Sequence, residues 1–181
     1  MKTLQSTLIT ELVVKTKEAL AHTELLLDQN LETLNKRPAE KAWSALECIQ
    51  HLNFYHHFYL PEFENINENG KAQQQPEFKS SFLGEYFANG MKYEAKAMKT
   101  LKSTNPIGSS LDKKCLTKFH QELERLLNIL GAATHKDLGK NKCGISISKL
   151  IRLKYGDALR VVIYHNERHL MQALKACGLI N

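Results

Sequence analysis

The chain of 181 residues is poor in the residues that make tight turns, with nine glycines and four prolines. β-Sandwiches and β-barrels need many such turns, so this scarcity argues against both. No stretch approaches the ~18 consecutive apolar residues of a membrane-spanning helix, and we expect no membrane partner. The first residues lack the apolar run of a signal peptide, so the expected compartment is the cytoplasm.

Cysteine is also sparse, and its spacing excludes some kinds of site. The four cysteines lie far apart, and none forms a CxxC pair. In a reducing compartment such cysteines are expected to be free thiols rather than disulfides. A structural zinc knuckle is therefore not expected at Cys48, Cys115, Cys143 or Cys177.

The two halves of the chain differ in charge. Residues 1–90 hold 8 basic and 12 acidic residues, a balance of −4, whereas residues 91–181 hold 17 and 7, a balance of +10. A basic half can attract nucleic acid or a small anion. The sequence contains no zinc finger, RNP-type aromatic motif or basic heptad, so a solvated surface is favoured and nucleic-acid binding is not expected.

Apolar residues recur at steps of three and four, which is typical of amphipathic helices. Four long helices are predicted, over about residues 4–34, 44–66, 109–131 and 156–176. We expect the second helix to begin at a capping box formed by Ser44 and Glu47, the third at Ser109 or Ser110, and the fourth at Asp157. Pro61 is expected to kink or interrupt the second helix. The third helix is expected to end at Gly131 and the fourth at Gly178.

The segments between these helices are expected to be mostly irregular. Residues 67–80 and 134–150 are predicted as loops, the second with a short extended piece at 145–147. Residues 81–101 are predicted to hold one or two helical turns. Four long helices predict an all-α four-helix bundle and a single domain over 1–181. The connection of about 40 residues between the second and third helices is too long for a simple hairpin.

His165 and His169 are four residues apart, so they lie on one face of the last helix. Two imidazoles at this spacing can chelate a transition metal. The spacing alone is a weak signal, because a chain with eight histidines contains such pairs by chance. Glu167 does not directly follow the first histidine, so the run lacks the zinc-protease pattern.

A third ligand has to come from another helix. His51 is flanked by Ile49 and Leu52, so it lies near the buried face of the second helix. The remaining histidines are expected elsewhere: His56 and His57 facing solvent, His22 partly buried in a structural role, and His120 and His135 at the surface.

Two segments of the chain resemble the signatures of one family. Residues 43–52, WSALECIQHL, resemble the WSxxExxxHL signature of the DinB-like superfamily of helical bundle proteins. The Gly156-Asp157 step and residues 165–172, HNERHLMQ, are similar to its second hallmark, a late helix with an HxxRHxxQ run. The resemblance covers essentially the whole chain.

This resemblance implies a four-helix bundle with up-down-down-up connectivity and a homodimer. It also implies one divalent metal ion, zinc or nickel, held by His51, His165 and His169. Characterised relatives include bacillithiol transferases and a mycothiol-dependent isomerase. The implied function is that of a metal-dependent transferase or hydrolase acting on a small-molecule substrate, with a low-molecular-weight thiol as a candidate cosubstrate. The alternative is a non-catalytic metal-binding or stress-response protein, because the sequence offers no strong general base.

Residues beside the expected ligands have open roles. Glu47 either bonds the second ring nitrogen of His51 or serves the capping box, and the capping role is favoured. Gln172 is expected to line the site. Arg168 either anchors an anionic substrate or forms a structural ion pair. Cys48 is expected to be a buried, inert thiol.

Overall fold

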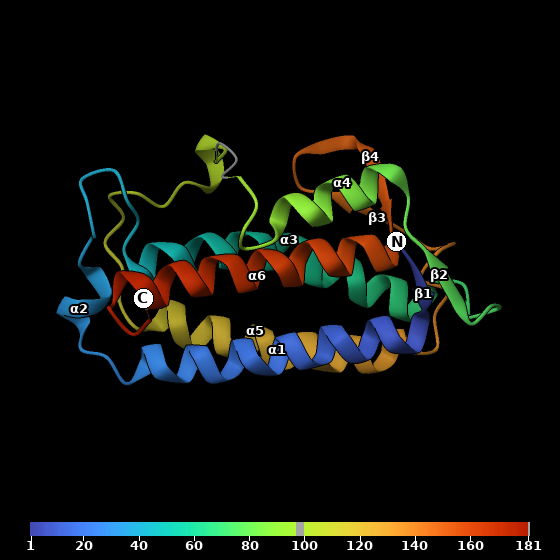
Figure 1. Cartoon of the computed structure of the whole chain (residues 1–181), viewed down its shortest axis with the longest axis horizontal. Coiled ribbons are helices and arrows are strands. Elements are labelled where there is room, and N and C mark those ends of the chain that lie inside the picture. The colour runs from blue at the N-terminus through green and yellow to red at the C-terminus, as the bar shows by residue number, and fades with distance from the viewer. Residues whose placement is uncertain (97–99, 181) are drawn as a thin grey trace.

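The computed structural model describes residues 1–96 and 100–180. Four long helices lie side by side and make up about half of the chain (Figure 1). They are α1 (Gln5–Leu27), α3 (Ala45–Asn69), α5 (Lys114–Ala133) and α6 (Tyr155–Ala176). Shorter helices, α2 (Leu31–Asn35), α4 (Phe82–Met91) and the 3-10 turn η1 (Lys102–Thr104), lie in the connections. The chain is thus mainly helical, as predicted.

Each long helix packs against two others. α1 and α3 both contact α5 and α6. Hydrogen bonds show which helix ends meet: the Lys113 ammonium, before α5, donates to the Leu27 carbonyl at the end of α1 (2.6 Å). The Leu138 amide, after α5, donates to Gln5 at the start of α1 (2.6 Å). α1 and α5 therefore run antiparallel.

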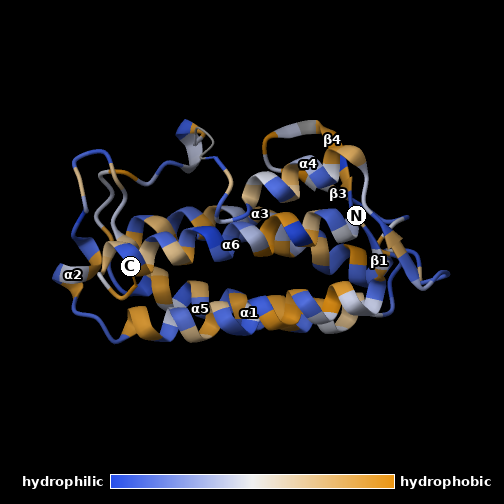
Figure 2. Ribbon diagram, viewed as in Figure 1, coloured by the Kyte–Doolittle hydropathy of each residue, from blue (hydrophilic) through white to orange (hydrophobic). Residues whose placement is uncertain are grey.

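The interior is divided along its length. Two clusters of buried apolar side chains occupy different stretches of the same four long helices. Buried polar residues on α3 and α6 separate them: His51, Asn53, His56, His165 and Asn166. Polar and apolar residues alternate along each long helix, as expected of helices that bury one face (Figure 2). The fold thus places a polar layer in mid-bundle.

The predicted ends of α3 and α6 are partly confirmed. The Ser44 hydroxyl accepts from the Glu47 amide, and the Glu47 carboxylate accepts from the Ser44 amide, which completes the capping box. α6 ends before Gly178, whose positive φ of 69° suits glycine. Pro61 does not interrupt α3. Proline has no backbone N–H, so the carbonyl of His57, four residues earlier, lacks its helical hydrogen bond. His57 is exposed.

Other predicted helix boundaries are wrong. The first predicted helix is broken, because α1 ends at Leu27 and the Asn30 side chain then caps α2 by accepting from the Thr33 amide (2.9 Å). The residue that precedes α5 is Lys113 rather than Ser109 or Ser110. Gly131 lies within α5 and does not end it.

The long connections are more ordered than predicted. Residues 67–69 still belong to α3, and β2 (Glu77–Lys79) pairs antiparallel with β1 (Lys2–Leu4). α4 has 10 residues, more than the one or two turns expected; part of that predicted segment, 97–99, lies outside the described residues. In place of part of the second loop, β3 (Lys142–Ile145) and β4 (Ser148–Lys154) form a hairpin. The extended piece predicted at 145–147 is wrong beyond Ile145, because residues 146 and 147 form the turn of this hairpin.

Candidate metal centre

The three predicted ligands meet between α3 and α6. One ring nitrogen from each of His51, His165 and His169 lies within 4.8 Å of the others. The Nε2 atoms of His51 and His165 are 3.2 Å apart. Two nitrogens bound to one tetrahedral zinc ion at ~2.05 Å would be about 3.3 Å apart, so this pair has the spacing of two ligands of one ion.

Hydrogen bonds fix which ring nitrogen is free on two of these histidines. His51 Nδ1 donates to the Thr104 carbonyl (2.7 Å), and His169 Nδ1 donates to the Gln172 side-chain oxygen (2.9 Å). Each Nε2 is therefore unprotonated and carries a lone pair. Metal-binding histidines usually have such a partner on the other nitrogen, so the donor set fits a transition metal.

The surroundings keep the three imidazoles neutral. Burial lowers the pKa of His51, and the hydrogen bond to Thr104 only partly offsets this. Burial, with the neighbouring imidazoles, holds the pKa of His165 well below its ordinary value. Burial and the nearby His51 lower the pKa of His169 to about 3. Neutral imidazole is the form that binds metal.

Two aromatic side chains enclose the histidines. The Trp43 ring centroid lies 4.7 Å from that of His51 and 5.5 Å from that of His169. The Tyr55 ring lies 4.6 Å from His165 and 4.9 Å from His51. Tyr55 was not predicted as part of the site, although its position four residues after His51 places both on one face of α3.

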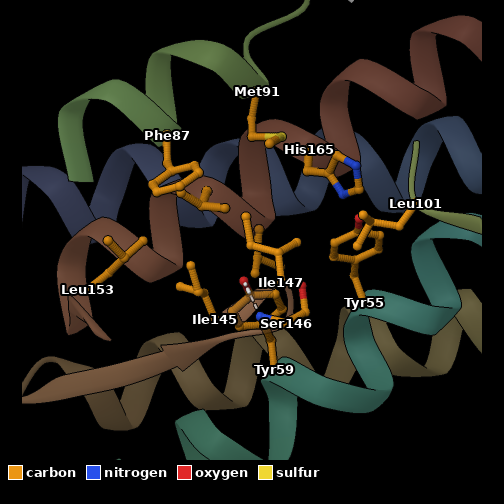
Figure 3. Close-up of a pocket in the computed structure, with 12 residues that line it drawn as sticks. Tyr55, Tyr59, Phe87, Met91, Leu101, Ile145, Ser146, Ile147, Leu153 and His165 are labelled. Atoms are coloured by element: carbon orange, nitrogen blue, oxygen red, sulfur yellow. Dashed lines mark hydrogen bonds between the residues drawn. The ribbon is translucent and has the colours of Figure 1, made fainter. Parts of the chain in front are cut away.

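A cleft of about 460 Å³ opens over the histidines. Gln172 lines it, as predicted, together with Lys41, Asn105 and Arg168. Whereas His51 and His165 are buried, His169 is partly exposed. A second, smaller cavity adjoins the cleft (Figure 3). The imidazoles can therefore be reached from outside.

Glu47 does not contact the histidines in this structure. Its carboxylate accepts from Arg37, from the Ser44 amide and from the Gly108 amide (2.9 Å). Burial alone raises the pKa of Glu47, but these hydrogen bonds outweigh it and hold the pKa below its ordinary value. Of its two predicted roles, the capping role is the one found. Cys48 is a buried free thiol whose pKa is raised by burial.

Arg168 and Asp157, both on α6, form hydrogen bonds to the segment that links α3 to α5. The Arg168 guanidinium donates to the carbonyls of Gly90, Lys92 and Ala95, at 3.3, 3.0 and 3.0 Å. These bonds give Arg168 a structural role, through carbonyls rather than through an ion pair. Asp157 was predicted to cap α6, which is wrong, because α6 begins at Tyr155.

Asp157 instead ties α6 to the start of α4. Its carboxylate accepts from the Ser81 amide (3.0 Å) and from the hydroxyls of Ser80 and Ser81. A Cβ atom on Gly84 would lie only 2.0 Å from this carboxylate, so glycine is required there. Asp157 thereby fixes the position of the helix that covers the smaller cavity.

His56 was predicted to face solvent, which is wrong. Its side chain is fully buried, its Nε2 lies 3.0 Å from the Asn166 side-chain oxygen, and its ring stacks on Phe119. α3 packs against both α5 and α6, so its buried face is wider than a single stripe. The other histidines lie away from the centre: His57 and His135 are exposed, and His22 and His120 are half-buried.

Within the described part of the chain, no helix combines the length and the apolar character needed to cross a membrane. Searches of curated proteins and of solved structures each returned no significant match. A comparison with known families matches residues 15–173 to the DinB superfamily. This match spans α1 to α6 and includes all three histidines. The chain belongs to the DinB superfamily.

Proposed function

We propose that this protein binds one divalent metal ion, zinc or nickel, through His51, His165 and His169, and uses it as a transferase or hydrolase on a small molecule. The observation that carries the proposal is the 3.2 Å separation of the His51 and His165 Nε2 atoms beside His169. Two of these rings are held by hydrogen bonds with the metal-binding nitrogen free.

The accessible cleft supports a catalytic role. A bound divalent ion would lower the pKa of a coordinated water or thiol, so that the nucleophile exists near neutral pH. A low-molecular-weight thiol is the candidate cosubstrate. The residues of the chain would do the rest: Trp43 and Tyr55 pack against the imidazole rings and help to orient them, and Arg168 holds residues 90–95 beside the cleft.

One observation favours a second function, metal binding without catalysis. Among the described residues, the lining of the cleft contains no aspartate or glutamate. A carboxylate that could act as a general base on a bound nucleophile is therefore missing from this lining. A metal-binding or stress-response role would need no such base.

The proposal also includes two features that the family resemblance implies, up-down-down-up connectivity of the helix bundle and a homodimer, and a cytoplasmic location. Antiparallel α1 and α5 support this connectivity, as does the hydrogen bond from the Gly156 amide at the start of α6 to the Leu138 carbonyl just after α5 (3.0 Å). Four free cysteines agree with a reducing compartment.

Metal analysis tests the ligand set. Protein purified without added metal, then loaded with zinc or nickel and dialysed, should hold about one equivalent. His51→Ala and His169→Ala should each weaken metal affinity by at least about tenfold, because each removes one of three ligands. His57→Ala, an exposed histidine on the same helix as His51, is the matched control and should bind as the wild type does. Equal affinity in His51→Ala and the wild type would contradict the proposal.

Activity assays separate the two functions. Metal-loaded protein is to be screened for conjugation of small thiols to electrophiles and for ester hydrolysis. Turnover that disappears in His169→Ala and persists in His57→Ala supports the enzyme. Binding of one equivalent of metal with no turnover in either assay supports the non-catalytic role.

A further inference from the structure

A second cavity, of about 210 Å³, lies next to the histidines, and its walls come from α3, α4, α6, the β3–β4 hairpin and Leu101. Figure 3 shows Phe87 and Met91 reaching in from α4, and Tyr55 and Tyr59 from the opposite side, on α3. Ile145 and Ile147 of the β3–β4 hairpin, with Val161 and Val162 of α6, complete most of the wall. The segments that make this cavity include α4, whose length the sequence underestimated, and the hairpin, which the sequence did not predict.

The wall of this cavity is apolar. Among the described residues, it includes no charged side chain. The Tyr59 hydroxyl is engaged, since it accepts from the Ser146 amide (3.3 Å). A charged group placed here would lose its hydration without a compensating ion pair, which is strongly unfavourable. The occupant must therefore be uncharged where it touches this wall.

The size of the cavity limits the occupant further. An apolar cavity of ~150 Å³ accepts a benzene ring in a protein interior. A cavity of about 210 Å³ therefore accommodates such a ring with one small substituent, or a short branched alkyl chain. The half-exposed side chains of Leu101 and Ile147 line it as well, so it opens to the surface.

The apolar cavity and the cleft share part of their lining. Tyr55, Met91 and His165 line both of them. A single molecule can therefore place a hydrocarbon group in the cavity and a polar group beside the imidazoles.

We infer that this cavity binds the hydrocarbon part of the substrate, a ring of about benzene size or a short branched alkyl chain, while the reacting group lies at the histidines. The position of the reacting group rests on the proposed metal site. The occupancy of the cavity by an apolar group does not.

The test uses toluene as an apolar probe and inositol as a polar probe of similar size, with binding followed by amide shifts of residues 144–147. Toluene should give saturable shifts, and inositol should give none. Ile147→Glu should weaken toluene binding by about tenfold, because it puts a carboxylate beside the apolar wall. The Ile147 side chain is 50% exposed, so this variant is expected to fold.

Leu150→Glu is the matched control, since Leu150 lies on the same hairpin, is 95% exposed and does not line the cavity. It should leave toluene binding within about twofold of the wild type. Toluene binding without saturation, or equal binding by the two glutamate variants, would overturn the inference. His51→Ala separates the two proposals: it should lose metal and keep toluene binding. If the wild type binds metal but shows no saturable toluene binding, the inference about the cavity is contradicted and the proposed metal site is not.

Discussion

His51 and His56 lie five residues apart on α3, and both are buried, yet their surroundings suit different roles. His51 has one nitrogen on a backbone carbonyl and the other facing His165. His56 is engaged by the Asn166 side chain, and burial lowers its pKa to about 4. The neutral ring of His56 thus links α3 to α6 through a hydrogen bond. It lies close to His51 and His165 but is not one of the three proposed metal ligands.

Glu47→Ala should destabilise the protein without abolishing the proposed metal binding. The change leaves the Ser44 and Gly108 amides and the Arg37 guanidinium without their shared acceptor. The expected loss in free energy of unfolding is about 2–4 kcal/mol, measured by urea denaturation. Glu47→Gln retains an acceptor for the Ser44 amide, so its loss should be smaller.

Both Glu47 variants should still take up one equivalent of metal at saturation. The opposite pattern, near wild-type stability with metal lost, would assign Glu47 to the metal centre in place of the capping role.

The candidate site was predictable only in part from its residues. The four-residue step between His165 and His169 places them on one face of a helix. Periodicity does not say which faces of two helices meet, so His51 could be added only through the family resemblance. The hydrogen bond from His51 to the Thr104 carbonyl could not be predicted, because every residue type has a backbone carbonyl and the sequence does not show which one lies nearby.

At the scale of elements, local signals explain which segments were predicted. α3 carries its capping box, and α6 has a long apolar stripe and a glycine after its end. α4 was underestimated because its stability comes from distant residues. Arg160 and Asp157, on α6, hold its first turns through Glu85 and Ser81. The β1–β2 pairing likewise joins strands that are more than 70 residues apart, so no local pattern could reveal it.

The junction between α4 and α6 should weaken in acid. The buried Arg160 guanidinium donates to Glu85 (2.9 Å) and, against the effect of burial, lowers the pKa of Glu85 to about 2. Because the pKa of Glu85 is lower in the folded state, its ion pair with Arg160 stabilises the fold fully when the pH is above the ordinary carboxyl pKa of 4.5. This stabilisation is lost as the pH falls from 4.5 toward 2. Glu85→Gln should therefore cost roughly 2 kcal/mol at pH 7 and much less at pH 2.5.

Urea denaturation of both proteins at pH 7, 4.5 and 2.5 measures this difference. Glu94→Gln, at an exposed position just after α4, is the control and should cost little at any of these pH values. A difference between Glu85→Gln and the wild type that stayed constant with pH would refute the assigned role of the carboxylate.

At the scale of the whole molecule, the polar layer has a cost and a use. Its histidines and asparagines divide the core into two apolar clusters, and each cluster loses the packing that a continuous core would have. Several polar atoms in this layer, including His56 Nδ1 and Asn166 Nδ2, have no hydrogen-bond partner among the described residues. Such groups reduce stability. In return, the layer brings donor nitrogens from two helices to one point that solvent can reach.

Metal removal should consequently lower the stability of the fold without abolishing it. The three proposed ligands join α3 to α6, so a metal ion that binds only the folded state would add about 2.7 kcal/mol when its free concentration is 100 times Kd. The two apolar clusters do not depend on the ion, so the protein treated with chelator should keep its helical circular dichroism and unfold at a lower urea concentration. His57→Ala should show the same gain on adding metal, whereas the gain in His51→Ala should be about half as large or smaller, because its metal affinity is at least about tenfold weaker. An equal gain in His51→Ala would mean that the ion stabilises the protein from somewhere other than the helix pair that carries these ligands.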